Sequence, residues 1–243
     1  MKKLIGLFLI TLSFFSCSNS DNNVAVTLEF THNWDGTTVT NQDFNTFKFT
    51  TKNGETISIV RLRYLISNLS LHGGDNYFLV DVGENSGNLI TITDIAPGTY
   101  NLNFTFGFSD IDNQDGIYQD LNSVNFGVPG MLGGGYHYMQ FDGKYKDTNN
   151  QDANFNYHAI RAVDRSNPNN LVFEDTSFLV NLGTVEIKNN ATVEIKMNIA
   201  EWFKNPNTWD LNQLNTVLMP NFDAQKLISA NGKTVFSSGT INQ

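Results

Sequence analysis

Alternation of apolar and polar residues with a period of two is the feature that most constrains the fold of this chain. Three segments show it clearly, at residues 24–34, 100–108 and 193–199, with apolar side chains at every second position. Successive side chains of a β-strand point to opposite faces, so this period predicts strands with one buried and one solvated face. A surface helix would instead repeat its apolar residues every three to four positions.

Further short strands are expected between turn signals along the rest of the chain. They fall at residues 44–50, 57–62, 77–82, 89–93, 136–141, 178–182 and 185–187, with turns at Asn53-Gly54 and Pro97-Gly98 among others. Helix is expected only at residues 223–230, with one more turn at 200–204. This pattern predicts an all-β fold, an antiparallel β-sandwich with minimal helix, forming one domain over residues 24–243.

The first residues have the order of a secretory signal. Two lysines precede an apolar run over residues 4–15, and Ser16 and Cys17 follow. Cys17 is the only cysteine, and we interpret it as a lipid-modified N-terminus. Residues 1–16 are then a signal peptide and residues 17–23 a lipidated polar tether. The alternative is an ordinary signal cut elsewhere, which would leave Cys17 as a free thiol.

A lipidated Cys17 implies attachment to a membrane through its acyl chains. The loose sequence before this cysteine is typical of Bacteroidetes lipoproteins. We therefore expect an outer membrane lipoprotein that faces the periplasm or the cell surface.

The charge and the residue pattern exclude several classes of function. The formal net charge is −9, which argues against binding to nucleic acid because phosphates require a basic surface. An acidic surface suits solubility or the attraction of cations. No Ser-His-Asp or Cys-His arrangement can be argued from the sequence, and the carboxylates are scattered, so the protein is not expected to be an enzyme.

Three histidines are the candidate metal ligands. Alternation places His32 on the apolar face of the first strand, on the same side as Trp34. His137 and Met139 should share one face of a later strand, and His158 lies in another expected strand. Imidazole, aided by thioether sulfur, suits copper, so converging histidines predict a copper or zinc site. The alternative is that each histidine is only hydrogen-bonded within the fold.

Several blocks of sequence occur in order along the chain. They are VRLRYLISNLSL at residues 60–71, PGTY through FGF at 97–108, the block containing GY and FDG at 131–143, FNYH at 155–158 and ANGKTVF at 230–236. Together they resemble the MbnP-like family, the methanobactin-associated copper-binding proteins. Where members of that family commonly carry Trp-x-Trp, this chain has Gly133 and Gly135.

The resemblance implies an all-β domain that binds copper outside the cytoplasm and takes part in copper acquisition or handling. It implies His32 and His158 as ligands, with His137 as a further candidate. Some members contain a tryptophan oxidised by a dihaem cytochrome peroxidase-like partner, and Trp34, beside His32, is the candidate here. A TonB-dependent receptor is a second candidate partner. The competing hypothesis is a metal-free β-sandwich module of the cell surface with binding or accessory function.

The lipid anchor generates the first prediction. A Cys17→Ala protein should leave the membrane fraction and become soluble, because it lacks the residue that carries the acyl chains. Fractionation of cells that express the two proteins measures this. A Cys17→Ala protein that stays in the membrane fraction would contradict the assignment of Cys17.

Overall fold

The computed structural model describes residues 23–167 and 169–243. The expected signal peptide, Cys17 and most of the tether lie outside these residues. Within the described residues, no helix has both the length and the apolar character needed to cross a membrane.

Fourteen strands and a few short helices make up the described residues. The strands are β1 Val24–Trp34, β2 Thr37–Thr38, β3 Phe49–Thr50, β4 Thr56–Ser67, β5 Tyr77–Asp81, β6 Leu89–Ile95, β7 Gly98–Phe106, β8 Met139–Lys146, β9 Asp152–Ala159, β10 Ala162–Asp164, β11 Val172–Glu174, β12 Phe178–Ile187, β13 Ala191–Asn198 and β14 Phe236–Asn242. The helices are α1 Gln119–Ser123, α2 Phe222–Gly232 and the 3-10 turns η1 Asn41–Asp43, η2 Gly130–Leu132 and η3 Ile199–Phe203. The expected all-β fold with little helix is confirmed.

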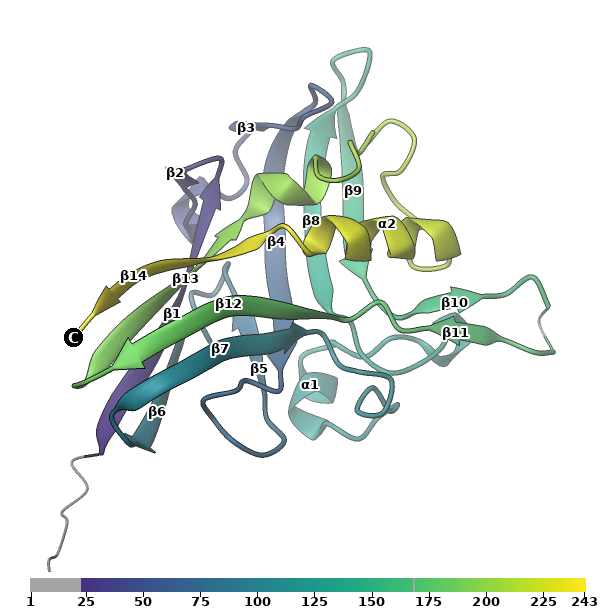
Figure 1. Cartoon of the computed structure of the whole chain (residues 1–243). Helices are drawn as coiled ribbons and strands as arrows, with labels where there is room; N and C mark the ends of the chain where they lie inside the picture. The colour runs from purple at the N-terminus through teal and green to yellow at the C-terminus, as the bar shows by residue number, and fades with distance from the viewer. Residues whose placement is uncertain (1–22, 168) are drawn as a thin grey trace, which may run out of the picture.

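Two sheets form the sandwich (Figure 1). The first has the order β14-β13-β1-β2, and β6 also pairs with β1. The second has the order β12-β7-β4-β8-β9, with β3 and β5 also paired with β4. A separate hairpin of β10 and β11 projects from the body, and α2 lies across the strands near β8 and β9 (Figure 1).

The first sheet contains one pairing that departs from the antiparallel expectation. β1 and β13 run parallel, with Leu28 opposite Val193 and Phe30 opposite Ile195. In both strands every second side chain is buried, which is the alternation seen in the sequence. The other strand pairs, including all those of the second sheet, are antiparallel.

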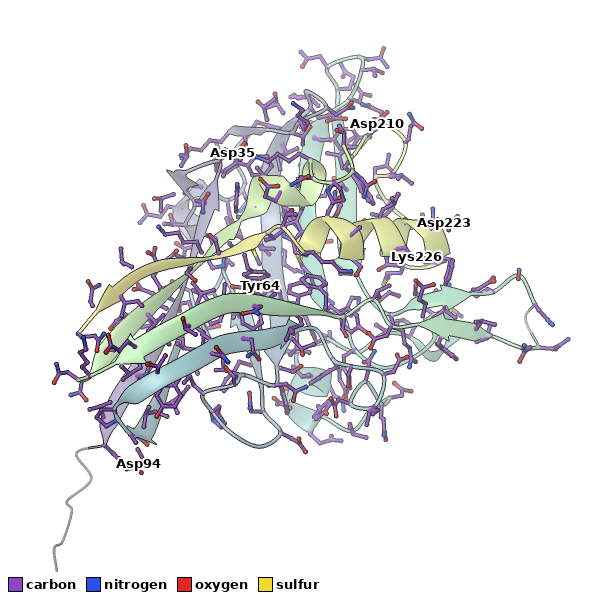
Figure 2. The ribbon with its side chains drawn as sticks, in the orientation of Figure 1. Asp35, Tyr64, Asp94, Asp210, Asp223 and Lys226 are labelled. Carbon is purple, nitrogen blue, oxygen red and sulfur yellow. The ribbon has the colours of Figure 1, made fainter. Side chains whose placement is uncertain are left out.

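Aromatic side chains fill the space between the sheets. Tyr64 of β4 lies fully buried in the interior (Figure 2), where its ring packs against those of Phe30, Phe106 and Phe236. Phe104 of β7 is also fully buried and meets the edges of Phe30 and Phe236 at centroid distances of 5.9 and 5.2 Å. The inner faces of both sheets therefore share one core.

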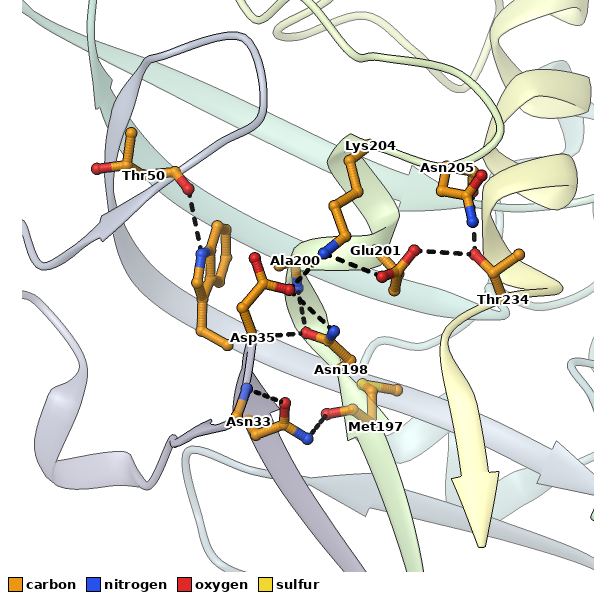
Figure 3. Close-up of polar contacts among 12 residues, drawn as sticks. Asn33, Asp35, Thr50, Met197, Asn198, Ala200, Glu201, Lys204, Asn205 and Thr234 are labelled. Atoms are coloured by element: carbon orange, nitrogen blue, oxygen red, sulfur yellow. Dashed lines mark hydrogen bonds and ion pairs between the residues drawn. The ribbon is translucent and has the colours of Figure 1, made fainter.

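A polar network fixes the end of β1 against the end of β13 (Figure 3). The backbone N–H of Asp35 donates to Asn198 Oδ1 at 2.9 Å, and Asn198 Nδ2 donates to the Asp35 carboxylate at 3.0 Å. Lys204 forms ion pairs with both Asp35 and Glu201. These contacts hold the turn after β1 against the η3 segment.

The structure corrects several details of the expected secondary structure. Of the expected strand at residues 44–50, only Phe49–Thr50 forms a strand, and Asn45 interrupts the extended backbone with a φ of 61°. Helix also occurs outside the two expected places, since the short helix α1 covers Gln119–Ser123. The two strands expected at residues 178–182 and 185–187 are one strand, β12, with an irregularity between Asn181 and Thr184.

The packing of Phe104 generates the second prediction. Phe104→Ala should lower the free energy of unfolding by about 3–5 kcal/mol, as truncation of a buried phenylalanine does elsewhere. Urea unfolding of the purified variant measures this. The control is Leu179→Ala, since Leu179 of β12 is 64% exposed and its loss should change stability by less than about 0.5 kcal/mol. Equal, small effects of both substitutions would contradict the inner face assigned to β7.

Candidate metal centre

His32 lies on the face of β1 that points into the interior of the sandwich. Its side chain is only 7% exposed, and its Nε2 lies 3.0 Å from the hydroxyl of Tyr64. The Tyr64 hydroxyl makes no other hydrogen bond within the described residues. A buried hydroxyl requires an acceptor for its proton, so Tyr64 donates to Nε2 and the His32 ring carries its own proton on Nδ1.

Burial lowers the pKa of His32 to about 4, so the ring is neutral at physiological pH. Trp34 is also buried, stacked on Phe49 at a centroid distance of 5.1 Å, and its indole N–H donates to the carbonyl of Thr50. Both side chains are thus part of the core. The lone pair on Nε2 of His32 already accepts the hydrogen bond from the Tyr64 hydroxyl.

His158 lies on the outer face of the second sheet. It stands opposite Gln140 in the β8–β9 register, while its neighbour Tyr157 points into the core and donates its hydroxyl proton to the Trp202 carbonyl. His158 Nε2 lies 2.7 Å from Oδ1 of Asp142, a residue of β8 on the same face. Nε2 therefore keeps its proton and donates it in a hydrogen bond to the carboxylate, which leaves a lone pair on Nδ1.

Asp142 is held as a carboxylate by its surroundings. Burial alone would raise its pKa, but hydrogen bonds from His158 and Asn156 and the positive charge of Arg61 bring the pKa below its usual value. Asn156 Nδ2 donates at 2.6 Å and Arg61 Nη1 lies at 3.4 Å. The ring of His158 is therefore oriented by an anion, an arrangement common behind metal-bound histidines.

His137 lies immediately before β8 and is 4% exposed. Its Nδ1 lies 2.9 Å from the carbonyl oxygen of Phe126, so Nδ1 carries the proton and Nε2 the lone pair. The amide nitrogen of Gln140 lies 3.3 Å from the same Nδ1. This amide is held by two other hydrogen bonds, because Arg63 donates to its oxygen and its nitrogen donates to the Asn125 carbonyl. Burial, together with the Coulombic effect of the neighbouring His158, lowers the pKa of His137 to about 4.

The rings of His137 and His158 are neighbours, with centroids 5.2 Å apart and planes at 82°. His137 Nε2 and His158 Nδ1 are both shielded from solvent, and neither has a hydrogen-bond partner within residues 23–167 and 169–243. A buried nitrogen without a partner is uncommon and costs free energy. Within these residues there is no group of three or more His, Cys, Asp or Glu side chains arranged to hold a metal, so the site is a pair of imidazoles.

The structure therefore groups the sequence candidates differently from the expectation. His32 and His158 do not come together, because one points into the sandwich from β1 and the other points outward from β9. His137 and Met139 do not share a face either, since Met139 is fully buried in the core. The regular alternation begins only at Met139, and the chain bends at Tyr138.

Two positioning residues were not among the sequence candidates. Asp142 was noted only as part of the FDG block, and its contact with His158 depends on the β8–β9 register. Gln225 of α2 is almost fully buried and its amide nitrogen donates to the backbone carbonyl of His158. No short-range signal in the sequence links helix α2 to β9.

Gly133 and Gly135 leave no room for the Trp-x-Trp that the resemblance to MbnP-like proteins led us to look for. Gly133 and Gly135 have φ of +112° and +77°, a region that L side chains rarely adopt. A Cβ at Gly133 would lie 2.6 Å from Val163, and one at Gly135 would lie 2.5 Å from Asn113. The described residues near His137 thus offer Phe126 rather than a tryptophan as the neighbouring aromatic ring.

The sequence profile of the MbnP family matches residues 23–220, which is most of the chain. The chain therefore belongs to the MbnP family. No curated protein and no solved structure matches it.

The neutral, buried state of His32 generates the third prediction. His32 has a pKa of about 6.5 in the unfolded chain and about 4 in the folded protein, so it binds a proton more weakly in the folded state. Its contribution to stability is complete above pH 6.5 and is lost as the pH falls toward 4. From pH 7 to pH 5, His32 alone should lower the free energy of unfolding of the metal-free protein by about 2 kcal/mol.

Urea unfolding at the two pH values measures this for the wild-type protein and for His32→Gln, which keeps an acceptor for Tyr64 but does not titrate. The variant should lose less stability than the wild type over this interval. The NMR resonances of the His32 ring in the folded protein give an independent reading and should not titrate above pH 5. A His32 ring that titrates near pH 6.5 would show that it is not buried in the neutral form.

Proposed function

We propose that this protein binds copper outside the cytoplasm and that His137 and His158 are its ligands. The observation that carries the proposal is the pair of unpartnered, buried nitrogen atoms on neighbouring rings, His137 Nε2 and His158 Nδ1. Membership of the MbnP family supports an association with copper. Copper handling in the cell envelope is the biological role that fits this chemistry.

The donor set excludes magnesium and calcium, and family membership favours copper among the metals that imidazole suits. Two neutral imidazoles match a borderline or soft metal and do not match magnesium or calcium, which prefer several oxygen ligands. Each ring has its proton fixed on the nitrogen that faces a protein acceptor, Asp142 for His158 and the Phe126 carbonyl for His137. Each lone pair is thereby held ready on the other nitrogen, so metal binding requires no change of tautomer.

Bound copper would supply a redox-active cation at this pair. The chain itself contributes orientation through Asp142, partial exclusion of water through the low exposure of both rings, and a fixed backbone at His158 through Gln225. His32 is not proposed as a ligand, because its Nε2 accepts a hydrogen bond from the Tyr64 hydroxyl inside the sandwich. Trp34 stands outside this proposal because its ring is packed between Phe49 and Phe203.

Copper titration generates the fourth prediction. The wild-type protein should bind one copper ion, and its melting temperature should rise with copper concentration because binding to the folded state stabilises it. A His137→Ala, His158→Ala double variant should lose both responses. His32→Gln should keep both, which makes it the matched control. Calorimetry and thermal unfolding measure the two effects.

Asp142→Asn tests the positioning of His158 separately from ligation. Loss of a partner behind a metal-bound histidine typically weakens metal affinity about 10–100-fold, and the same loss is expected here. Circular dichroism of the metal-free variant should be unchanged. Equal and weak copper binding by the wild type and the double variant would contradict the proposal and favour the metal-free surface module instead.

A further inference from the structure

A cavity of about 160 Å³ lies beside β1, where the regular pairings of the strand with β6 and with β2 stop short of each other on one edge. The pairing with β6 ends at Glu29, and the pairing with β2 begins only at Asn33. Between them, the edge of β1 at Phe30 to His32 faces the segment around Val39 and the turn that joins β5 to β6. Within this stretch the Phe30 N–H donates to the Asn88 carbonyl and the His32 carbonyl accepts from the Val39 N–H, so the cavity lies beside a short interruption of the regular ladder.

The His32 ring presents a hydrogen-bond donor to this cavity. Its Nε2 is occupied by Tyr64, so the proton lies on Nδ1, as argued above. Nδ1 makes no hydrogen bond within the described residues. It is also absent from the set of solvent-shielded nitrogen atoms without a partner there, so solvent reaches it. The side chain is otherwise buried, and Nδ1 therefore opens onto the cavity that His32 lines. A ligand oxygen would satisfy this donor.

The remaining wall is apolar on one side and carries uncharged or acidic polar groups on the other. Phe30, Val39 and Val82 supply the apolar surface and are all buried. Asn88 offers an amide that makes no side-chain hydrogen bond within the described residues. Asp81 also lines the cavity, but its Oδ1 accepts from the Glu84 backbone N–H and the residue stands opposite Arg63 in the β4–β5 register.

No lysine or arginine lines the cavity, and neither of its carboxylates, Glu29 and Asp81, is in an ion pair within residues 23–167 and 169–243. An anionic ligand would therefore be disfavoured, since no cation lines the cavity to balance its charge.

The volume limits the ligand to one ring. A cavity of roughly 150 Å³ accommodates one benzene molecule, so about 160 Å³ suits a single six-membered ring with substituents that reach the opening. An apolar wall combined with amide, imidazole and carboxylate groups matches a ring that has a C–H face and hydroxyl groups at its edge.

We propose that this cavity binds one pyranose ring of an uncharged saccharide, with His32 Nδ1 and Asn88 on its hydroxyl groups. The site is separate from the proposed copper pair, because His32 lies inside the sandwich and His158 lies on the outer face of the second sheet. The proposal therefore does not depend on copper binding.

The test uses the full chain and a set of neutral methyl glycosides, those of glucose, galactose, mannose and N-acetylglucosamine, with methyl glucuronide as the anionic counterpart. Saturation-transfer NMR and calorimetry measure binding. At least one neutral glycoside should bind, and the glucuronide should bind about tenfold or more weakly. Asn88→Ala should weaken the neutral ligand about tenfold, and Asn149→Ala, an exposed asparagine remote in sequence from the cavity, should leave it unchanged.

Val82→Phe fills the cavity and should abolish binding. If that variant does not fold, Asn88→Ala and its control decide the result. The proposal is overturned if no neutral glycoside binds with a Kd below about 10 mM. It is also overturned if Asn88→Ala binds as the wild type does, or if the glucuronide binds as well as the neutral glycosides.

Discussion

The parallel pairing of β1 with β13 is the interaction on which the rest of the sandwich depends. Its register runs from Val26 opposite Ala191 to Asn33 opposite Asn198 and joins the two ends of the domain. β14 then pairs with β13, and β6 pairs with β1, so the remaining strands of the first sheet are aligned by it. Both central strands direct alternate apolar side chains inward, where they meet the aromatic residues of the second sheet.

That same arrangement separates the histidines into two environments. His32 belongs to the inner face of the first sheet, and the Tyr64 hydroxyl fixes its tautomer. His158 belongs to the outer face of the second sheet, where the Asp142 carboxylate fixes its tautomer in the opposite sense. The chemistry of each ring follows from which nitrogen its neighbour occupies. A lone pair shielded from solvent remains at His137 and His158, and an N–H remains at His32.

The proposed copper pair combines a regular element with an irregular one. His158 is placed by the β8–β9 ladder, and the helix residue Gln225 holds its backbone. His137 is placed by a segment outside the strands, which is held by hydrogen bonds from its backbone and ring to the Phe126 carbonyl. Arg63 and Gln140 in turn hold the chain around Asn125. One imidazole on a regular strand and one in an irregular segment can thus lie side by side, although no sequence motif joins them.

The sequence by itself determined the class of fold, because alternation with a period of two requires strands that are buried on one face. Phe104, His32 and Trp34 were placed correctly on inner faces by that rule alone. The same rule failed at His137, since it holds only where the strand is regular, and this residue precedes β8. The strands β10, β11 and β14 were not expected, because β10 and β11 are only three residues long and the mostly exposed residues of β14 alternate weakly.

Only the tertiary structure decided which histidines are neighbours. The family resemblance supplied the expectation of copper, but the contact between His137 and His158 depends on strand register and on the bend at Tyr138. Asp142 became a positioning residue only when β9 paired with β8 and brought Asn156 and His158 to its carboxylate. Hydrogen-bonded strand pairing joins residues that are distant in the chain, and the period of a single strand does not specify its partner.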